Sequence, residues 1–478
     1  MTADAHPPPA KPSAPGAKVL LARFCASAVL LVALAVNLWN LASVPFHPDE
    51  ATWIFMSRDL ALLAREGPGA VCWQPGAAAD PVALERARTA PLPRHILGLE
   101  RLAGILPAGA VPVDWDWTTT WAVNAERGAV PLASVLLAAR LPMALLTSLA
   151  ALLVFLIARR MGGAGAGWAA ALLFIFNALM LLHGRRAMSE AALVFGLCLA
   201  VWLMMRLPRA GLIQGAGVAL AVLAKHPGIV AWPAALLSAL WPVAAPGDAP
   251  APKRPGAMGQ GAVRAMRTLT LMALGFVVVF GLLSPSLWCR PLSALSATLR
   301  GRTSLVDAQV EALRSAGAAF VLATPAEHIV ALIDRVFVAS PVFWEIPNYA
   351  AETAASEAAY MRGPIANLLR GPVWGSGMLA QALLGAAIGA LLLFRRASKG
   401  ELDAAGAASR RDLALVLVWT LSTALGLLAL VPFAWQRYYL PLVPALCVWQ
   451  GYGLGHLVRA GRMVGGMVGG TRNCRSRE

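Results

Sequence analysis

The chain has 478 residues, of which 58% are hydrophobic and only 13% are charged, about half the charged fraction of an average soluble protein. This composition excludes a soluble globular enzyme, a disordered chain and a small secreted disulfide scaffold, and it indicates a polytopic helical membrane protein. The formal net charge of +16 would also suit a nucleic-acid-binding protein, so the position of the charges must decide between the two classes.

The chain starts with a polar segment and continues as a series of apolar runs. Residues 1–18 are rich in proline and alanine, and we expect a disordered cytoplasmic tail. Residues 19–44 are too long for the core of a typical signal peptide, so they are predicted to be an uncleaved anchor. Ten runs are candidate spans of a hydrocarbon core of about 30 Å, at 19–44, 131–158, 166–183, 187–205, 210–224, 228–243, 268–287, 373–394, 412–432 and 440–457.

Two of these runs, 210–224 and 228–243, are short and are separated by Lys225-His226-Pro227. They could be short helices beside a cavity or a bent re-entrant pair, and neither option changes the later topology. The sequence thus predicts an all-α membrane domain over 19–457 with about ten transmembrane helices, within limits of nine and thirteen. Residues 458–478 follow as a basic cytoplasmic tail.

The charges are divided unequally between the two predicted faces. If the N-terminus is cytoplasmic, the cytoplasmic face holds 21 Lys/Arg and 6 Asp/Glu, in segments 1–23, 159–165, 206–209, 244–267, 395–412 and 458–478. The rest of the chain holds 19 Lys/Arg and 18 Asp/Glu. This distribution satisfies the positive-inside rule and places both termini in the cytoplasm. The basic residues are spread over several short loops without a recognition module, which argues against nucleic acid as a partner.

Two large loops, about 45–130 and 289–372, are predicted on the outer face. Neither has room for a full nucleotide-binding domain, and no phosphate-binding glycine motif follows a plausible strand. Cys72 and Cys289 both map to this face, where an oxidising compartment would permit a disulfide, but the sequence does not give their separation and two free thiols are the alternative.

The most distinctive polar feature is His47-Pro48-Asp49-Glu50, directly after the first span. Apolar residues then recur at helical spacing, which predicts an amphipathic interfacial helix that starts at Pro48. The two acids have an ordinary interpretation as favourable charges in a first helical turn. Their functional interpretation is that one carboxylate at the membrane surface acts as a general base.

Three further polar segments interrupt the apolar runs at the same face. Residues 183–190 hold Arg185, Arg186 and Glu190, a second segment holds Lys225, and residues 435–441 hold Arg437 and Tyr438. A charge at the middle of a bilayer costs at least about 2.5 kcal/mol, so these residues must lie at the outer edge or line a wet cavity. Taken singly, each could be an arginine or lysine that reaches lipid headgroups, or an aromatic residue of the interfacial belt.

Taken together, these residues predict a phosphate site in the interface. Cations from distant segments would bind the phosphate, and a nearby carboxylate would activate a hydroxyl or amine. A polyprenyl-phosphate sugar suits this arrangement, because its tail stays in the bilayer and its phosphate is the leaving group. His47 beside two acids is too small a ligand set to support a divalent metal, and no cofactor is predicted.

The order of these segments resembles the GT-C membrane glycosyltransferases, specifically the family 39-like group of protein O-mannosyltransferases and the aminoarabinose lipid A transferase. The similarity covers about residues 25–457 and is best before 235 and after 430. The matching segments are VPFHPDEATW (44–53), GRRAMSEAALVF (184–195), LAKHPGIVAWP (223–233), SPSLWCRP (284–291) and RYYLPLVP (437–444).

This resemblance implies a GT-C-like bundle in the cell (plasma or inner) membrane with its active site on the outer, periplasmic side. It implies an inverting transfer of a sugar from a polyprenyl-phosphate donor to a lipid, glycan or protein acceptor. The loop 289–372 does not resemble the MIR insertion of the eukaryotic enzymes, so their protein substrate is not implied. The resemblance implies that Asp49 is the general base, that Glu50 is the acid paired with it, and that Glu190 is the acid of the second outer loop. It also implies contacts with the donor or the cavity for Arg185 or Arg186, Lys225, Arg437 and Tyr438.

Two alternatives remain open at this stage. A transporter or lipid flippase shares the membrane class, but its binding residues usually lie near the midplane on broken helices and within inverted repeats, and no repeat is visible here. An O-antigen polymerase or ligase shares the large outer loop but does not account for an acidic pair directly after the first span.

Overall fold

The computed structural model describes residues 15–241, 257–315, 321–344, 349–394 and 404–474, and within these ranges the secondary structure is helical apart from one isolated bridge between Val321 and Phe433. Six helices have the length and apolar composition to cross a membrane. They are α1 (Pro15–Leu38), α7 (Ala133–Gly162), α10 (Ser189–Arg206), α13 (Ala257–Leu282), α17 (Pro372–Phe394) and α18 (Ala404–Leu430).

The remaining predicted spans are shorter helices or broken ones. The run 166–183 forms α8 (Ala164–Ile175) and α9 (Ala178–His183), because Asn177 accepts hydrogen bonds from the backbone N–H groups of residues 179 and 180 and so starts a new helix. The runs 210–224 and 228–243 form the short elements α11 (Gly211–Ala224), η4 (His226–Ala231) and α12 (Trp232–Leu240). The last run differs, because it begins the 32-residue helix α19 (Val443–Cys474). The prediction of an all-helical polytopic membrane protein is confirmed.

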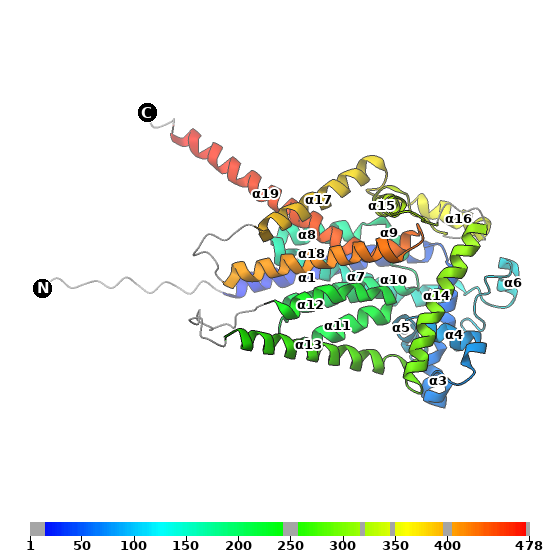
Figure 1. Cartoon of the computed structure of the whole chain (residues 1–478). Coiled ribbons are helices and arrows are strands. Elements are labelled where there is room, and N and C mark those ends of the chain that lie inside the picture. The colour runs from blue at the N-terminus through cyan, green and yellow to red at the C-terminus, as the bar shows by residue number, and fades with distance from the viewer. Residues whose placement is uncertain (1–14, 242–256, 316–320, 345–348, 395–403, 475–478) are drawn as a thin grey trace.

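The start of α1 and the last turns of α19 lie at the same end of the bundle, and the loop helices lie at the opposite end (Figure 1). The first loop forms η1 (Leu41–Ser43), α2 (Pro48–Met56), α3 (Arg58–Glu66), η2 (Pro68–Ala70), η3 (Ala77–Ala79), α4 (Pro81–Arg88), α5 (Leu92–Leu102) and α6 (Trp121–Glu126). The second forms η5 (Pro285–Leu287), α14 (Pro291–Ser315), α15 (Pro325–Ile333), η6 (Asp334–Val338) and α16 (Ala350–Met361), and η8 (Gln436–Leu442) precedes α19.

The predicted tail is described only in part. Helix α1 already begins at Pro15, so residues 15–18 are helical, and residues 1–14 lie outside the described part of the chain.

Small residues let the membrane helices pack closely. A Cβ atom placed on Gly215 of α11 would lie 1.9 Å from the carbonyl oxygen of Met272 in α13, and one on Gly385 of α17 would lie equally close to the carbonyl oxygen of Trp449 in α19. Only glycine permits such contacts, which are typical of helix pairs in membranes. The short helix α11 is therefore held against a full-length partner.

The two outer loops are joined covalently. Cys72, after η2, forms a disulfide with Cys289, after η5, and their Cα atoms are 5.7 Å apart. The sequence left this pairing open, and the structure shows it formed.

Candidate active site

The first turn of α2 presents the two acids in fixed and different directions. His47 caps the helix: its Nδ1 accepts a hydrogen bond of 3.1 Å from the Asp49 N–H, and its own N–H donates to Glu50 Oε2 at 3.0 Å. Pro48 takes the first helical position, where a missing N–H costs nothing. The predicted helix start at Pro48 agrees with the structure, although the helix ends at Met56 and α3 begins at Arg58.

Asp49 reaches across the chain to the last loop. Its carboxylate forms an ion pair with Nη1 of Arg437, which lies in η8. The side chain of Asp49 keeps 29% of its surface exposed, whereas that of Arg437 is 10% exposed. Asp49 is therefore a partly accessible carboxylate beside a cation that is 388 residues away in sequence.

Glu50 is fully buried and fully bonded. Its two carboxylate oxygens accept hydrogen bonds of 2.8 and 2.7 Å from Arg140 in α7, and the N–H of Ala187 donates at 2.8 Å. Burial raises the pKa of Glu50, but the charge and hydrogen bonds of Arg140, together with the charge of Arg186, outweigh it and hold the pKa below its ordinary value. This geometry fits a carboxylate that fixes α2 against α7 better than one that exchanges protons with a substrate.

Lys225 is held by a second buried acid. Its Nζ lies 2.7 Å from Oε1 of Glu190, which starts α10 and is 1% exposed. The same Nζ lies 5.0 Å from the ring centre of Tyr438, a cation–π distance. Tyr438 in turn stacks on Trp435 with ring centres 5.4 Å apart. The end of Lys225 is thus fixed by one carboxylate and one aromatic face.

A cavity of about 670 Å³ lies beside these residues. Its lining is mostly apolar and comes from α10, η4, α13, α14 and α18, but three permanently basic side chains of the described chain also border it: Lys225, Arg302 and Arg437. Tyr438, His226 and several serine and threonine residues also line it. Such a cavity can hold a long apolar tail with an anionic head at the cationic end.

Arg185 and Arg186 are placed differently from Lys225 and Arg437. Arg185 donates to the carbonyl oxygen of Leu181, to that of Trp39 at 3.0 Å and to the hydroxyl of Tyr360 at 3.3 Å. Nε of Arg186 donates to the carbonyl oxygen of Pro45 at 3.2 Å. Both arginines are buried against loop backbone, and neither borders the large cavity.

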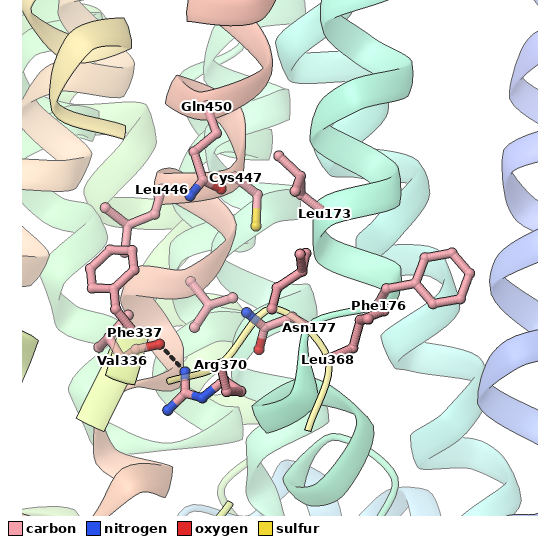
Figure 2. Close-up of a pocket in the computed structure, with 12 residues that line it drawn as sticks. Leu173, Phe176, Asn177, Val336, Phe337, Leu368, Arg370, Leu446, Cys447 and Gln450 are labelled. Carbon is pink, nitrogen blue, oxygen red and sulfur yellow. Dashed lines mark hydrogen bonds between the residues drawn. The ribbon is translucent and has the colours of Figure 1, made fainter. Parts of the chain in front are cut away.

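A second, much smaller hollow of about 30 Å³ lies between α8, η6 and α19 (Figure 2). Arg370 borders it, and Figure 2 shows its guanidinium bonded to the carbonyl oxygen of Val336. The guanidinium also donates at 2.8 Å to the carbonyl oxygens of Arg335 and Ala339. Arg370 therefore satisfies the carbonyl groups at the end of η6, and this hollow has no room for a lipid-linked sugar.

The structure brings four of the predicted site residues into two ion pairs, Asp49 with Arg437 and Glu190 with Lys225, around one cavity that Tyr438 also borders. Sequence reasoning missed Arg140, although a charged residue inside the predicted span 131–158 is itself a signal. It also missed Arg302, which continues an apolar stripe on α14 that includes Leu295, Leu299 and Val306. The spacing of that stripe is helical and could have placed Arg302 on the inner face.

The sequence of the segment 132–248 matches the family model for dolichyl-phosphate-mannose-protein mannosyltransferases. This segment resembles GT-C glycosyltransferases. It contains Arg140, Glu190 and Lys225, whereas Asp49 and Arg437 lie outside it. No curated protein matches the chain.

Solved structures of membrane glycosyltransferases also align with the chain. An oligosaccharyltransferase of Archaeoglobus fulgidus, solved with Zn and sulfate, aligns with a TM-score of 0.48 and 13% identity over 92% of this chain and 50% of its own. ArnT from Cupriavidus metallidurans, bound to undecaprenyl phosphate, aligns with a TM-score of 0.31 and 16% identity over 93% of this chain and 78% of its own. The chain thus spans about half the length of the oligosaccharyltransferase.

Among the described residues, no three or more His, Cys, Asp or Glu side chains gather in a way that would hold a metal ion.

Proposed function

We propose that this protein is an inverting glycosyltransferase that moves a sugar from a polyprenyl-phosphate donor to an acceptor at the outer face of a cell membrane. The observation that carries the proposal is the ion pair between Asp49 and Arg437 at the edge of an apolar cavity that Lys225 and Arg302 also border. The match of residues 132–248 to a family described by a lipid-phosphate-linked mannose donor supports the same donor class.

In this proposal the polyprenyl tail lies along the apolar lining and the donor phosphate meets the three cations. Asp49 accepts the proton of the acceptor hydroxyl or amine as the new bond forms to the anomeric carbon. The bond from that carbon to the phosphate oxygen breaks, and its electron pair leaves with the polyprenyl phosphate. A single displacement of this kind inverts the anomeric centre.

The cations stabilise the charge that develops on the leaving phosphate. A phosphate is a good leaving group, so one carboxylate for the acceptor suffices and no second acid is required. Glu190 does not touch the reacting atoms in this scheme. It holds Lys225 at 2.7 Å and, with Tyr438, fixes the direction of its ammonium group.

The ion pair of Asp49 suggests how the donor prepares the base. Arg437 contacts Asp49 and borders the cavity, so a donor phosphate that binds Arg437 competes with Asp49 for the same guanidinium. Donor binding would therefore release the carboxylate toward the acceptor. This exchange makes the base available only when a donor is present.

Two features support the outer face as the side of the chemistry. The Cys72–Cys289 disulfide lies in the same loops as α2 and α14, and disulfides persist in oxidising compartments. The ends of α7 and α10 away from these loops carry Arg159, Arg160 and Arg206, which belong to segments that the positive-inside rule assigns to the cytoplasm.

The experiment that tests this function compares two arginines on α14. Arg302 borders the cavity and Arg300, two residues earlier, is exposed. In purified full-length protein with a panel of polyprenyl-phosphate sugars, we expect wild type to form product from at least one donor. Arg302→Met and Lys225→Met should each raise the KM for that donor about tenfold or more, because a charge-assisted phosphate contact is lost.

Arg300→Met is the matched control and should leave that KM unchanged. Absence of transfer from every donor by wild-type protein, or an equal effect of both arginine variants, would contradict the proposed donor site.

A further inference from the structure

Two of the segments that line the cavity lie far apart in sequence. One is the end of α4 and the turn after it, which contribute Ala87, Thr89 and Pro91. The other runs from Ser284 through α14 and carries Arg302. The position of Arg302 relative to Lys225 and Arg437 therefore depends on how α14 is fastened to the rest of the protein.

Helix α14 crosses the end of the bundle instead of running along it (Figure 1). Part of its surface is uncovered: Leu292 is 82% exposed, and Leu299, on the stripe that borders the cavity, is 64% exposed. At its C-terminal end, Leu313 packs against Phe433 and Trp435. Its N-terminal half packs against α4 of the first loop: Ala294 is fully buried, and a Cβ atom placed on Gly301 would lie 3.6 Å from the side chain of Leu84.

Three further interactions fasten this half of α14 to the first loop. The disulfide joins Cys289, two residues before α14, to Cys72 in the first loop, across 217 residues of sequence. Next to it, the N–H of Trp73 donates to the carbonyl oxygen of Ser286 at 3.0 Å. One turn before Arg302, the hydroxyl of Thr298 donates to the carbonyl oxygen of Ala87 at 2.8 Å. The first loop thus holds α14 at its start and in its middle.

We propose that the Cys72–Cys289 disulfide is a positioning element for the donor phosphate. It keeps the N-terminal half of α14 against the first loop so that Arg302 faces the same phosphate as Lys225 and Arg437. This inference rests on the proposed function, since it assumes that the cavity holds a polyprenyl phosphate. The disulfide does not touch the donor and acts only through α14.

The test measures binding of undecaprenyl phosphate to the purified full-length chain by ligand-dependent shifts of the unfolding temperature, which report both the fold and the affinity. Reduction of folded wild-type protein, and separately the Cys72→Ser/Cys289→Ser double variant, should each raise the apparent Kd about tenfold. Reoxidation should restore the affinity of the wild type. The reduction arm does not depend on whether the double variant folds.

Two comparisons separate positioning from general stabilisation. In an Arg302→Met background, reduction should change the Kd less than twofold, because the residue through which the disulfide acts is already absent. Cys25→Ser, at a free and half-buried cysteine of α1, is the matched control and should bind like wild type.

The inference is overturned if reduced wild type binds undecaprenyl phosphate with unchanged affinity, or if reduction weakens binding equally in the Arg302→Met background. Either result leaves the proposed function standing, because wild type still binds the lipid. If oxidised wild type does not bind undecaprenyl phosphate, both the inference and the proposed donor class are contradicted.

Discussion

Asp49→Asn should lower the rate of sugar transfer at least about a hundredfold, because an amide cannot accept the proton of the acceptor. The side chain keeps its size, and the helix cap of α2 uses only the backbone N–H of this residue. We therefore expect normal protein level and membrane insertion, and donor binding at least as tight as in wild type because Asp49 no longer competes for Arg437. The measurement is product formation per molecule of purified protein at saturating donor.

Asp307→Asn is the matched control for this variant, since Asp307 is an exposed carboxylate on α14. It should transfer sugar at the wild-type rate. Product formation by Asp49→Asn at the rate of this control would remove Asp49 from the mechanism, whereas lost insertion of the variant would show that Asp49 serves the fold.

Glu50→Gln and Arg140→Met should each have a large effect on stability. Both changes leave one partner of a fully buried ion pair without its counter-charge, and such losses cost about 3–5 kcal/mol. We expect a marked fall in folded protein and in the unfolding temperature in detergent. Glu66→Gln, at an exposed acid that ends α3, should leave both unchanged.

The stabilisation by the Glu50–Arg140 pair depends on pH, and the sign of this dependence follows from the lowered pKa of Glu50. The pKa of Glu50 is lower in the folded protein than its ordinary value of 4.5, so the stabilisation is fully present above that value. It is lost as the pH falls through the still lower folded-state pKa. Normal stability of both variants at neutral pH would show that the pair does not hold α2 against α7.

The helical class and the segments of the site could be predicted from the sequence for a physical reason. Long apolar runs must be helical in a bilayer, and each polar residue at their ends must find water or a partner. Asp49, Glu190, Lys225 and Arg437 were therefore visible as candidates. The first turn of α2 was visible as well, since Pro48 and two acids are typical of a helix start.

The different roles of the individual site residues could not be predicted from the sequence. Asp49 and Glu50 are adjacent and chemically alike, yet one reaches Arg437 and the other is enclosed by Arg140 and the Ala187 N–H. That difference depends on which helix packs against each face of α2. The roles of Arg185 and Arg186 depend in the same way on folding, because only the folded chain places their guanidinium groups against loop backbone.

The most direct test of the account is a structure of the full-length protein with bound undecaprenyl phosphate in a lipid nanodisc. We expect the phosphate oxygens within hydrogen-bond distance of Lys225, Arg302 and Arg437, with the tail along α13 and α18 and the carboxylate of Asp49 released from Arg437. A phosphate bound elsewhere, or an Asp49–Arg437 pair that persists beside the bound lipid, would contradict the account.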